Sequence, residues 1–231
     1  MRKAILASCI ALALAGCDQD LAATLYLRDV QDLLSSAEHE RLPTDVTIEV
    51  RETGLAKQCE KPEGSQMVEA VASVFEKASL ISCESVSGSM NDRMIIKAST
   101  YIEHAGNEGR AGDYLVYFTV HNNDEGYGTV TVGFNRDKYE VLQKRIQSIF
   151  MMVRPSLDNA AISVTVNNDQ RRDVHFVTTG GVFADGLPID GPLELTLAPR
   201  QEVRLKLGDV KSSFLSKNGF TVVGAVAPSE R

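Results

Sequence analysis

The sequence predicts an α+β protein with an N-terminal mixed sheet and two or three helices, followed by a small antiparallel all-β sandwich or barrel domain. Two observations lead to this fold class. Up to about residue 154, segments with a two-residue apolar period alternate with segments of helical 3-4 spacing. From residue 161 onward the apolar segments are short and no long helical pattern recurs. We therefore expect an α+β domain over residues 21–154 and an all-β domain over residues 160–228.

The first elements of the predicted α+β domain are a strand, a short helix and a second strand. Apolar and polar residues alternate over 21–28, which is typical of a strand with one buried face. Asp29 can cap a short helix in which Val30 and Leu33 share one face. Val46, Ile48 and Val50 then alternate with polar residues, so we expect another strand there.

Two amphipathic helices and four strands complete this half. Residues 54–64 are polar and are interpreted as a loop, after which Ser65 caps a helix that runs to about Ala78. Strands are expected over 80–86, 94–102, 114–120 and 127–134. The best helical pattern starts at Asn135 or Asp137, and Pro155 ends it.

The predicted all-β half contains short strands separated by turn residues. Asp185-Gly186 is a strong two-residue hairpin signal between the strands 182–184 and 187–189. Further strands are expected over 162–166, 174–178, 193–197, 203–207 and 220–226, with a short helix over 210–215.

The N-terminus has the composition of an export signal. Arg2 and Lys3 precede an apolar run over 4–15, which is too short to cross a bilayer at about 20 residues. Leu14-Ala15-Gly16-Cys17 follows, and residues 1–17 closely resemble the signal peptide and lipobox of bacterial lipoproteins. The resemblance implies cleavage after residue 16, a diacylglycerol thioether on Cys17 and usually an acyl chain on its new amino group. The alternative is an ordinary secretory signal in which Cys17 is incidental.

The residues after Cys17 predict which membrane holds the protein. In enteric-type Gram-negative cells, lipoproteins with Asp after the lipidated Cys resemble those retained in the inner membrane. Asp18 and Gln19 fit this pattern, so we expect attachment to the periplasmic face of the inner membrane. Residues 17–20 would form a lipidated tether, of which Asp18–Asp20 span only about 10 Å.

Charge and cysteine content narrow the possible partners. Removal of residues 1–16 takes away Arg2 and Lys3 and changes the formal net charge from −7 to −9. This acidic body argues against nucleic acid and against electrostatic adsorption to anionic lipid, so membrane binding must come from the acyl chains. Cys59 and Cys83 remain, and in an oxidising periplasm they are expected to form a disulfide; two separate thiols are the alternative.

No catalytic site, cofactor or metal site is expected from the sequence. The four histidines, His39, His104, His121 and His175, are not spaced for joint metal binding on one element. The common hydrolase motifs Gly-x-Ser-x-Gly and His-Glu-x-x-His do not occur. The oxygen-rich turns 122–125 and 167–169 could hold calcium loosely, although a plain polar turn is the preferred interpretation.

Aromatic residues gather on the predicted strands between residues 114 and 134. They could line a ligand groove, whereas such residues more often belong to the core; they are Tyr114, Tyr117, Phe118, Tyr127 and Phe134.

The layout as a whole is similar to that of lipoproteins carried by bacteriophages and prophages. The similarity rests on the lipobox, the strand-helix segment 24–34, and the strands 182–189 and 195–207. It implies an accessory role in the cell envelope, with phage superinfection exclusion as one setting, and it carries no catalytic residues.

We therefore expect a membrane-anchored periplasmic lipoprotein, not an enzyme, that acts as a binding or interaction module with an envelope protein partner. One alternative is a small-ligand or lipid carrier with a cavity between sheet and helices, and another is a hydrolase with dispersed residues. A large apolar pocket would favour the carrier. A cleft with clustered perturbed carboxylates or histidines would favour the enzyme, and a closed core with an exposed apolar patch would favour the interaction module.

Overall fold

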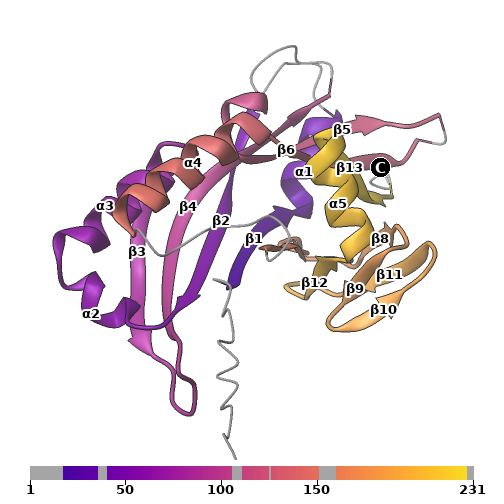
Figure 1. The fold of residues 1–231 in the computed structure, drawn as a ribbon. Helices are drawn as coiled ribbons and strands as arrows, with labels where there is room; N and C mark the ends of the chain where they lie inside the picture. The colour runs from indigo at the N-terminus through magenta and orange to yellow at the C-terminus, as the bar shows by residue number, and fades with distance from the viewer. Residues whose placement is uncertain (1–17, 36–40, 106–110, 125, 151–159, 228–231) are drawn as a thin grey trace, which may run out of the picture.

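The structure is a computed structural model that describes residues 18–35, 41–105, 111–124, 126–150 and 160–227 (Figure 1). Of these residues, 50% lie in strands and 27% in helices, so the protein is mainly β. Among the described residues, no helix is long and apolar enough to cross a membrane.

The described strands and helices are interspersed in the first two thirds of the chain. The strands are β1 (Asp18–Tyr26), β2 (Arg41–Glu52), β3 (Glu76–Ser85), β4 (Asp92–His104), β5 (Val116–Asn122), β6 (Gly128–Phe134), β7 (Ala160–Asn167), β8 (Val174–Thr178), β9 (Val182–Ala184), β10 (Leu187–Ile189), β11 (Leu193–Leu197), β12 (Glu202–Leu207) and β13 (Phe220–Val226). The helices are α1 (Leu27–Ser35), α2 (Leu55–Cys59), α3 (Pro62–Ala72), α4 (Arg136–Ile149) and α5 (Asp209–Asn218), with a 3-10 turn, η1, over Ala111–Asp113.

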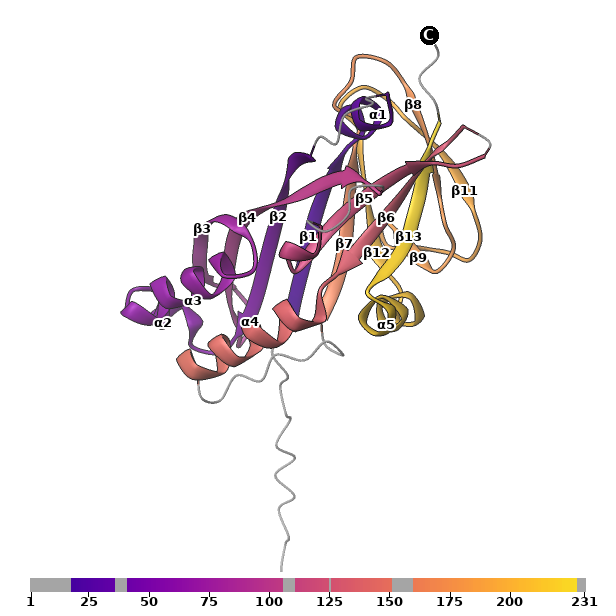
Figure 2. The same ribbon diagram turned by 90° about the horizontal axis from the view of Figure 1, so that it is seen from above.

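All of these strands belong to one sheet. Its order is β10-β9-β12-β7-β1-β2-β4-β5-β6-β13-β8-β11, and β3 pairs with β4 beside this path. The two ends of the order, β10 and β11, are consecutive in the chain, so the curved sheet nearly returns to its own beginning (Figure 2).

The predicted fold class, an α+β domain followed by a separate small all-β sandwich or barrel, is wrong. β7 pairs in parallel with β1, and β13 pairs with β6, so strands from both halves of the sequence alternate within one sheet. The predicted boundary at residues 154–160 falls mostly on residues 151–159, outside the described residues. The described residues before 154 contain four α-helices rather than two or three, because α2 lies within the segment that was expected to be a loop.

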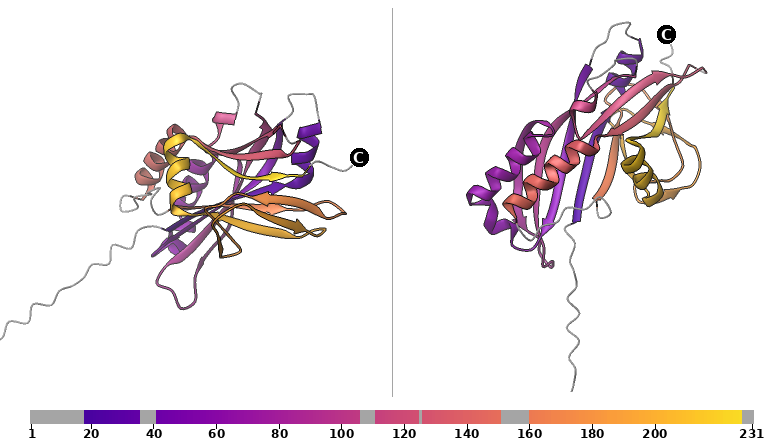
Figure 3. Two further views of the ribbon diagram at one scale, coloured as in Figure 1. Left: turned by 90° about the vertical axis from the view of Figure 1, so that its right-hand side faces the viewer. Right: turned by 45° about the horizontal axis from the view of Figure 1, so that its top comes forward.

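The core lies on the inner face of the curved sheet. On this face the strands contribute every second residue, as the alternating burial of β2 and β5 shows. α3 and α4 pack side by side across the β2–β4 region (Figure 3), while α1 packs against β4 and β5. Large side chains under 2% exposed fill the interior, among them Leu25, Leu27, Phe118, Phe176, Leu205 and Leu215.

Helix α3 begins earlier than the sequence analysis expects. Pro62 rather than Ser65 starts it, because proline lacks the backbone N–H that the first turn of a helix leaves unpaired. The helix ends at Ala72, and β3 starts at Glu76, so residues 76–78 are strand rather than helix.

Strand β1 also begins earlier than expected. Asp18, Gln19 and Asp20 pair with β2, and Gln19 and Asp20 pair with β7 on the other side. The predicted tether over residues 18–20 is therefore part of the sheet. The residue that directly precedes this strand is Cys17, which lies outside the described residues.

Candidate functional site

A shallow groove of about 340 Å³ lies on the outer face of the sheet, where α4 begins and α5 ends. Three neighbouring strands, β5, β6 and β13, form its floor, and residues at the two helix ends form its rim. Its lining consists of Gly112, Tyr117, Phe134, Asn135, Arg136, Asp137, Asn218, Gly219 and Phe220.

Strand register assembles the aromatic part of this groove. Tyr117 lies opposite Gly133, and Gly133 lies opposite Phe220 on the next strand. A side chain at position 133 would collide with the Tyr117 ring, so this ring lies over the glycine. The phenol ring therefore fills the space between β5 and β13 and contributes an aromatic surface to the groove.

Exposed apolar residues continue from the groove along α5. Phe220 is 53% exposed, and the ring of Phe214, 47% exposed, meets it edge to face with centroids 6.2 Å apart. Val210 is 85% exposed and precedes Phe214 by one helical turn, so both lie on one face of α5. We call Val210, Phe214 and Phe220 the aromatic patch.

The polar rim of the groove comes from two helix ends. The Asn135 side chain caps α4 by accepting a hydrogen bond from the backbone N–H of Lys138 at 3.1 Å. Gly219 ends α5 in the left-handed conformation, and its carbonyl accepts from the N–H of Phe134 at 2.8 Å. This hydrogen bond links the residue that ends α5 to the end of β6, directly before α4 begins.

A second polar constellation connects β2, β3 and β4. The Arg41 guanidinium lies 3.6 Å from the ring centre of Tyr101 and 5.1 Å from that of Tyr114. Tyr101 donates a hydrogen bond to a Glu76 carboxylate oxygen at 2.7 Å, and Tyr114 donates to the other oxygen. We call Arg41, Glu76, Tyr101 and Tyr114 the Arg41 cluster.

The contacts within the Arg41 cluster keep the Glu76 carboxylate ionised and both tyrosines neutral. Hydrogen bonds from Tyr114 and Tyr101 lower the pKa of the Glu76 carboxyl. Burial, followed by the hydrogen bond to Glu76, raises the pKa of Tyr114 to about 12. Each charged group thus has an internal partner, and the cluster is suited to joining three strands rather than to exchanging protons near neutral pH.

Comparison with known proteins assigns the chain to a family. A family model described as "Domain of unknown function (DUF7424)" matches residues 19–230. The chain belongs to this DUF7424 family. No curated protein matches the chain significantly, and no solved structure does either. The DUF7424 match starts within β1 and extends past the end of β13, in agreement with one sheet built from both halves of the sequence.

The aromatic residues of strands 114–134, expected more often to belong to the core than to a groove, divide between the two. Tyr117 and Phe134 line the groove, whereas Phe118 is fully buried in the core and Tyr114 belongs to the Arg41 cluster. Sequence reasoning missed Phe214 and Phe220. The signal for them was one phenylalanine directly after the Asn218-Gly219 turn and another one helical turn before Asn218, a spacing that places Phe214 in the last turns of α5 and Phe220 at the start of β13.

The turn at residues 167–169 is a structural junction. Asn168 is fully buried, and its amide nitrogen donates to the carbonyls of Arg172, Leu197 and Ala198 at 2.8, 2.7 and 3.1 Å. Its amide oxygen accepts from the N–H of Gln170 at 3.1 Å. This side chain presents donors to its neighbours, so the plain-turn interpretation fits it better than calcium ligation.

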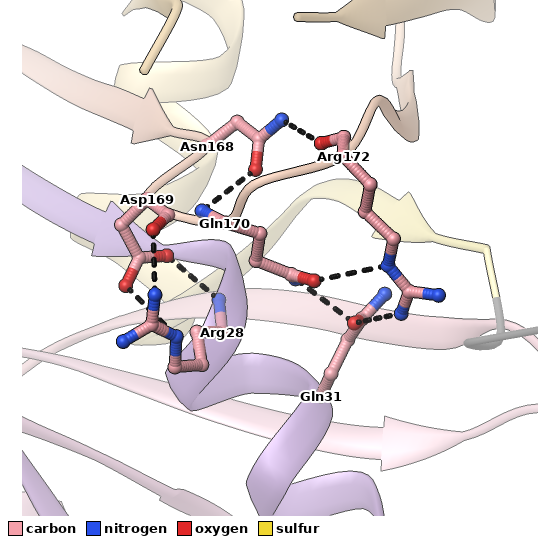
Figure 4. A network of polar contacts seen from close by, with 6 residues as sticks. All are labelled: Arg28, Gln31, Asn168, Asp169, Gln170 and Arg172. Carbon is pink, nitrogen blue, oxygen red and sulfur yellow. Dashed lines mark hydrogen bonds and ion pairs between the residues drawn. The ribbon is translucent and has the colours of Figure 1, made fainter. Parts of the chain in front are cut away.

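The same turn holds the start of α1 (Figure 4). One Asp169 carboxylate oxygen accepts from the backbone N–H of Arg28 at 3.0 Å, and the Arg28 guanidinium donates to the Asp169 carbonyl at 2.7 Å. Gln31 accepts from the side chains of Gln170 and Arg172 at 2.9 and 3.3 Å. A residue far away in the sequence thus caps α1 in place of Asp29.

The remaining predicted site residues lie apart from the groove. Cys59 at the end of α2 and Cys83 in β3 form a disulfide with Cα atoms 6.3 Å apart, which agrees with the expected pairing. Asp18 and Gln19 begin β1, while Cys17 and His39 lie outside the described residues. Among the described residues, no group of three or more His, Cys, Asp or Glu side chains could hold a metal ion.

Proposed function

We propose that the protein is a membrane-anchored periplasmic lipoprotein that acts as a non-enzymatic binding or interaction module in the cell envelope. The observation that carries the binding role is a filled interior combined with an exposed aromatic patch beside an open groove. The proposed partner is another envelope protein, which would bury this patch.

The packing of the interior favours an interaction module over a lipid carrier. A carrier needs an apolar cavity that encloses most of its ligand. Here the inner face of the sheet is occupied by the protein's own side chains, with Phe118 and Phe176 fully buried. The groove of about 340 Å³ is open and has a polar rim, so it suits side chains of a docked protein better than an acyl chain.

The aromatic patch is the kind of surface that protein partners bury. Exposed aromatic residues next to polar ones are enriched at protein interfaces, where a few of them contribute most of the binding energy. Phe214 and Phe220 hold each other in place through their edge-to-face contact, so little side-chain entropy would be lost on docking.

The start of β1 supports the membrane-anchored part of the proposal. With a lipid on Cys17, the sheet would begin one residue after the attachment point and the body would lie against the bilayer. Asp18 and Gln19 support retention in the inner membrane, provided the host sorts lipoproteins as enteric Gram-negative bacteria do.

Membrane fractionation tests the anchor. The Cys17→Ser variant should lose lipidation and lipoprotein-type cleavage, whereas the control Cys9→Ser, within the signal sequence, should mature normally. Asp18→Ser should move the protein from the inner to the outer membrane. A Cys17→Ser protein that matures at the same size and stays with the membranes would refute the lipoprotein assignment.

Photo-crosslinking in intact cells tests the binding role. A photoreactive phenylalanine analogue placed at position 220 or 214 should capture an envelope protein. The matched control is position 141, because Val141 on α4 is 42% exposed but does not belong to the patch. Capture of the same proteins at all three positions, or of no protein at position 220, would count against the patch as a docking surface.

A further inference from the structure

We infer that the tip of the β3–β4 hairpin, residues 86–91 with the exposed Met90, is a second membrane contact that inserts into the lipid headgroup region beside the anchor. This inference rests on the proposed lipidation of Cys17. The proposed partner of the hairpin tip is the membrane lipid itself, in addition to the lipid chains attached to Cys17.

Strand register places the hairpin next to the attachment point. Asp18 of β1 lies opposite Arg51 of β2, Arg51 lies opposite Arg93 of β4, and Arg93 lies opposite Glu84 of β3. These four residues form one row across the sheet. Neighbouring strands are about 4.8 Å apart, so β4 lies only about 10 Å to the side of β1.

The hairpin continues beyond this row, on the same side of the row as the N-terminal end of β1. Cys17 is the residue directly before Asp18 in the sequence, and consecutive Cα atoms are about 3.8 Å apart. Met90 is three residues beyond Arg93, which corresponds to at most about 10 Å at roughly 3.3 Å per residue. Figure 1 shows the β3–β4 hairpin projecting well past the start of β1. A lipid on Cys17 therefore brings the tip to the level of the headgroups.

The composition of the tip suits that environment. Residues 86–91 carry no charge, Gly88 forms the turn with a φ of 80°, and Met90 is 89% exposed. Directly behind the tip, Ser85 donates to Asp92 at 2.6 Å and Arg93 pairs with Glu84. The Arg93–Glu84 ion pair and the Asp92 carboxylate mark where the hairpin meets water, and the uncharged tip adds no repulsion of its own toward anionic lipid.

Tryptophan fluorescence can measure the depth of the tip, because the sequence contains no tryptophan. The full-length lipidated protein carrying Met90→Trp is reconstituted into vesicles of phosphatidylethanolamine and phosphatidylglycerol with brominated acyl chains. Matched controls are Ile81→Trp, at an exposed site further back along β3, and Asp124→Trp, on the β5–β6 hairpin. Any general affinity of tryptophan for lipid would affect all three variants, so a difference between them reports the position of the tip.

We expect at least a twofold loss of fluorescence for Met90→Trp, a smaller loss for Ile81→Trp and none for Asp124→Trp. Mass analysis and vesicle flotation of the same samples report lipidation separately. A lipidated protein that floats while Met90→Trp is quenched no more than Asp124→Trp would overturn the hairpin contact and leave the anchor intact. A protein without the diacylglycerol mass would overturn both proposals.

Discussion

Asn168 shows how much a single buried amide can stabilise in this fold. Its NH2 group shares two hydrogens among the carbonyls of Arg172, Leu197 and Ala198, and its amide oxygen accepts from Gln170. Asn168→Ala removes these contacts from a fully buried position, including the buried one to the Leu197 carbonyl, so the free energy of unfolding should fall by about 2–4 kcal/mol. Chemical denaturation measures the change. The neighbouring Asn167→Ala removes only an exposed contact to Glu202 and should cost less than about 0.5 kcal/mol.

Tyr114 gives a prediction for high pH. Its pKa is raised to about 12 by burial and by the hydrogen bond to Glu76, whereas an unfolded tyrosine ionises near 10. A raised pKa in the folded state contributes stability that is present below pH 10 and is lost as pH rises toward 12. The free energy of unfolding should therefore fall over this window, and it should fall less steeply for Tyr114→Phe. Denaturation curves at pH 9, 10 and 11 compare the two proteins.

A second variant separates the causes of this shift. Burial is the largest one, so Glu76→Gln should bring the pKa of Tyr114 only part of the way back toward 10, as followed by ultraviolet absorbance of the phenolate. A return all the way to 10 in a folded protein would show that Glu76 rather than burial dominates.

At the scale of single elements, the Cys59–Cys83 disulfide joins α2 to the edge strand β3 across 24 residues of sequence. Replacing both cysteines by alanine should lower the free energy of unfolding by about 3 kcal/mol, the chain-entropy value for a loop of this length. Thermal unfolding of the oxidised protein and the double variant measures the loss. Equal stability of the two proteins would mean that α3 and β4 already fix β3 without the covalent link.

The sequence was sufficient to predict most elements but not their pairing. The strands β8, β9, β10, β11 and β13 have the expected bounds, because two-residue alternation and Gly-containing turns are local signals. The short helix α2 was missed because five residues are too few for a helical period to show. The groove was not the preferred interpretation of the aromatic residues, because Tyr117 and Phe220 lie on either side of Gly133 only through strand pairing across about a hundred residues.

At the scale of the whole molecule, strands from the last third of the chain are inserted into the same sheet as strands from the first part, which makes the protein one unit rather than two domains. β7 pairs with β1 about 140 residues earlier, and β13 lies between β6 and β8. No local pattern specifies such pairs, because each strand has the same alternation whichever neighbour it takes. After residue 160 the apolar segments do become shorter, but this marks shorter strands and connections rather than the start of a separate core.

This interleaving predicts that the two halves depend on each other for folding. A fragment of residues 18–150 would lack the partners of β1 and β6, and two long strand edges with their apolar inner faces would meet water. We expect this fragment and the fragment 160–231 each to be unfolded or aggregated, whereas the chain from residue 18 to 231 unfolds in one cooperative transition. Far-ultraviolet circular dichroism and tyrosine fluorescence during urea denaturation provide the test, and the two probes should give coincident curves. A fragment 18–150 that is monomeric and unfolds cooperatively would instead show that the N-terminal strands form a core of their own, and the pairing of β7 with β1 would then be docking between two folded units.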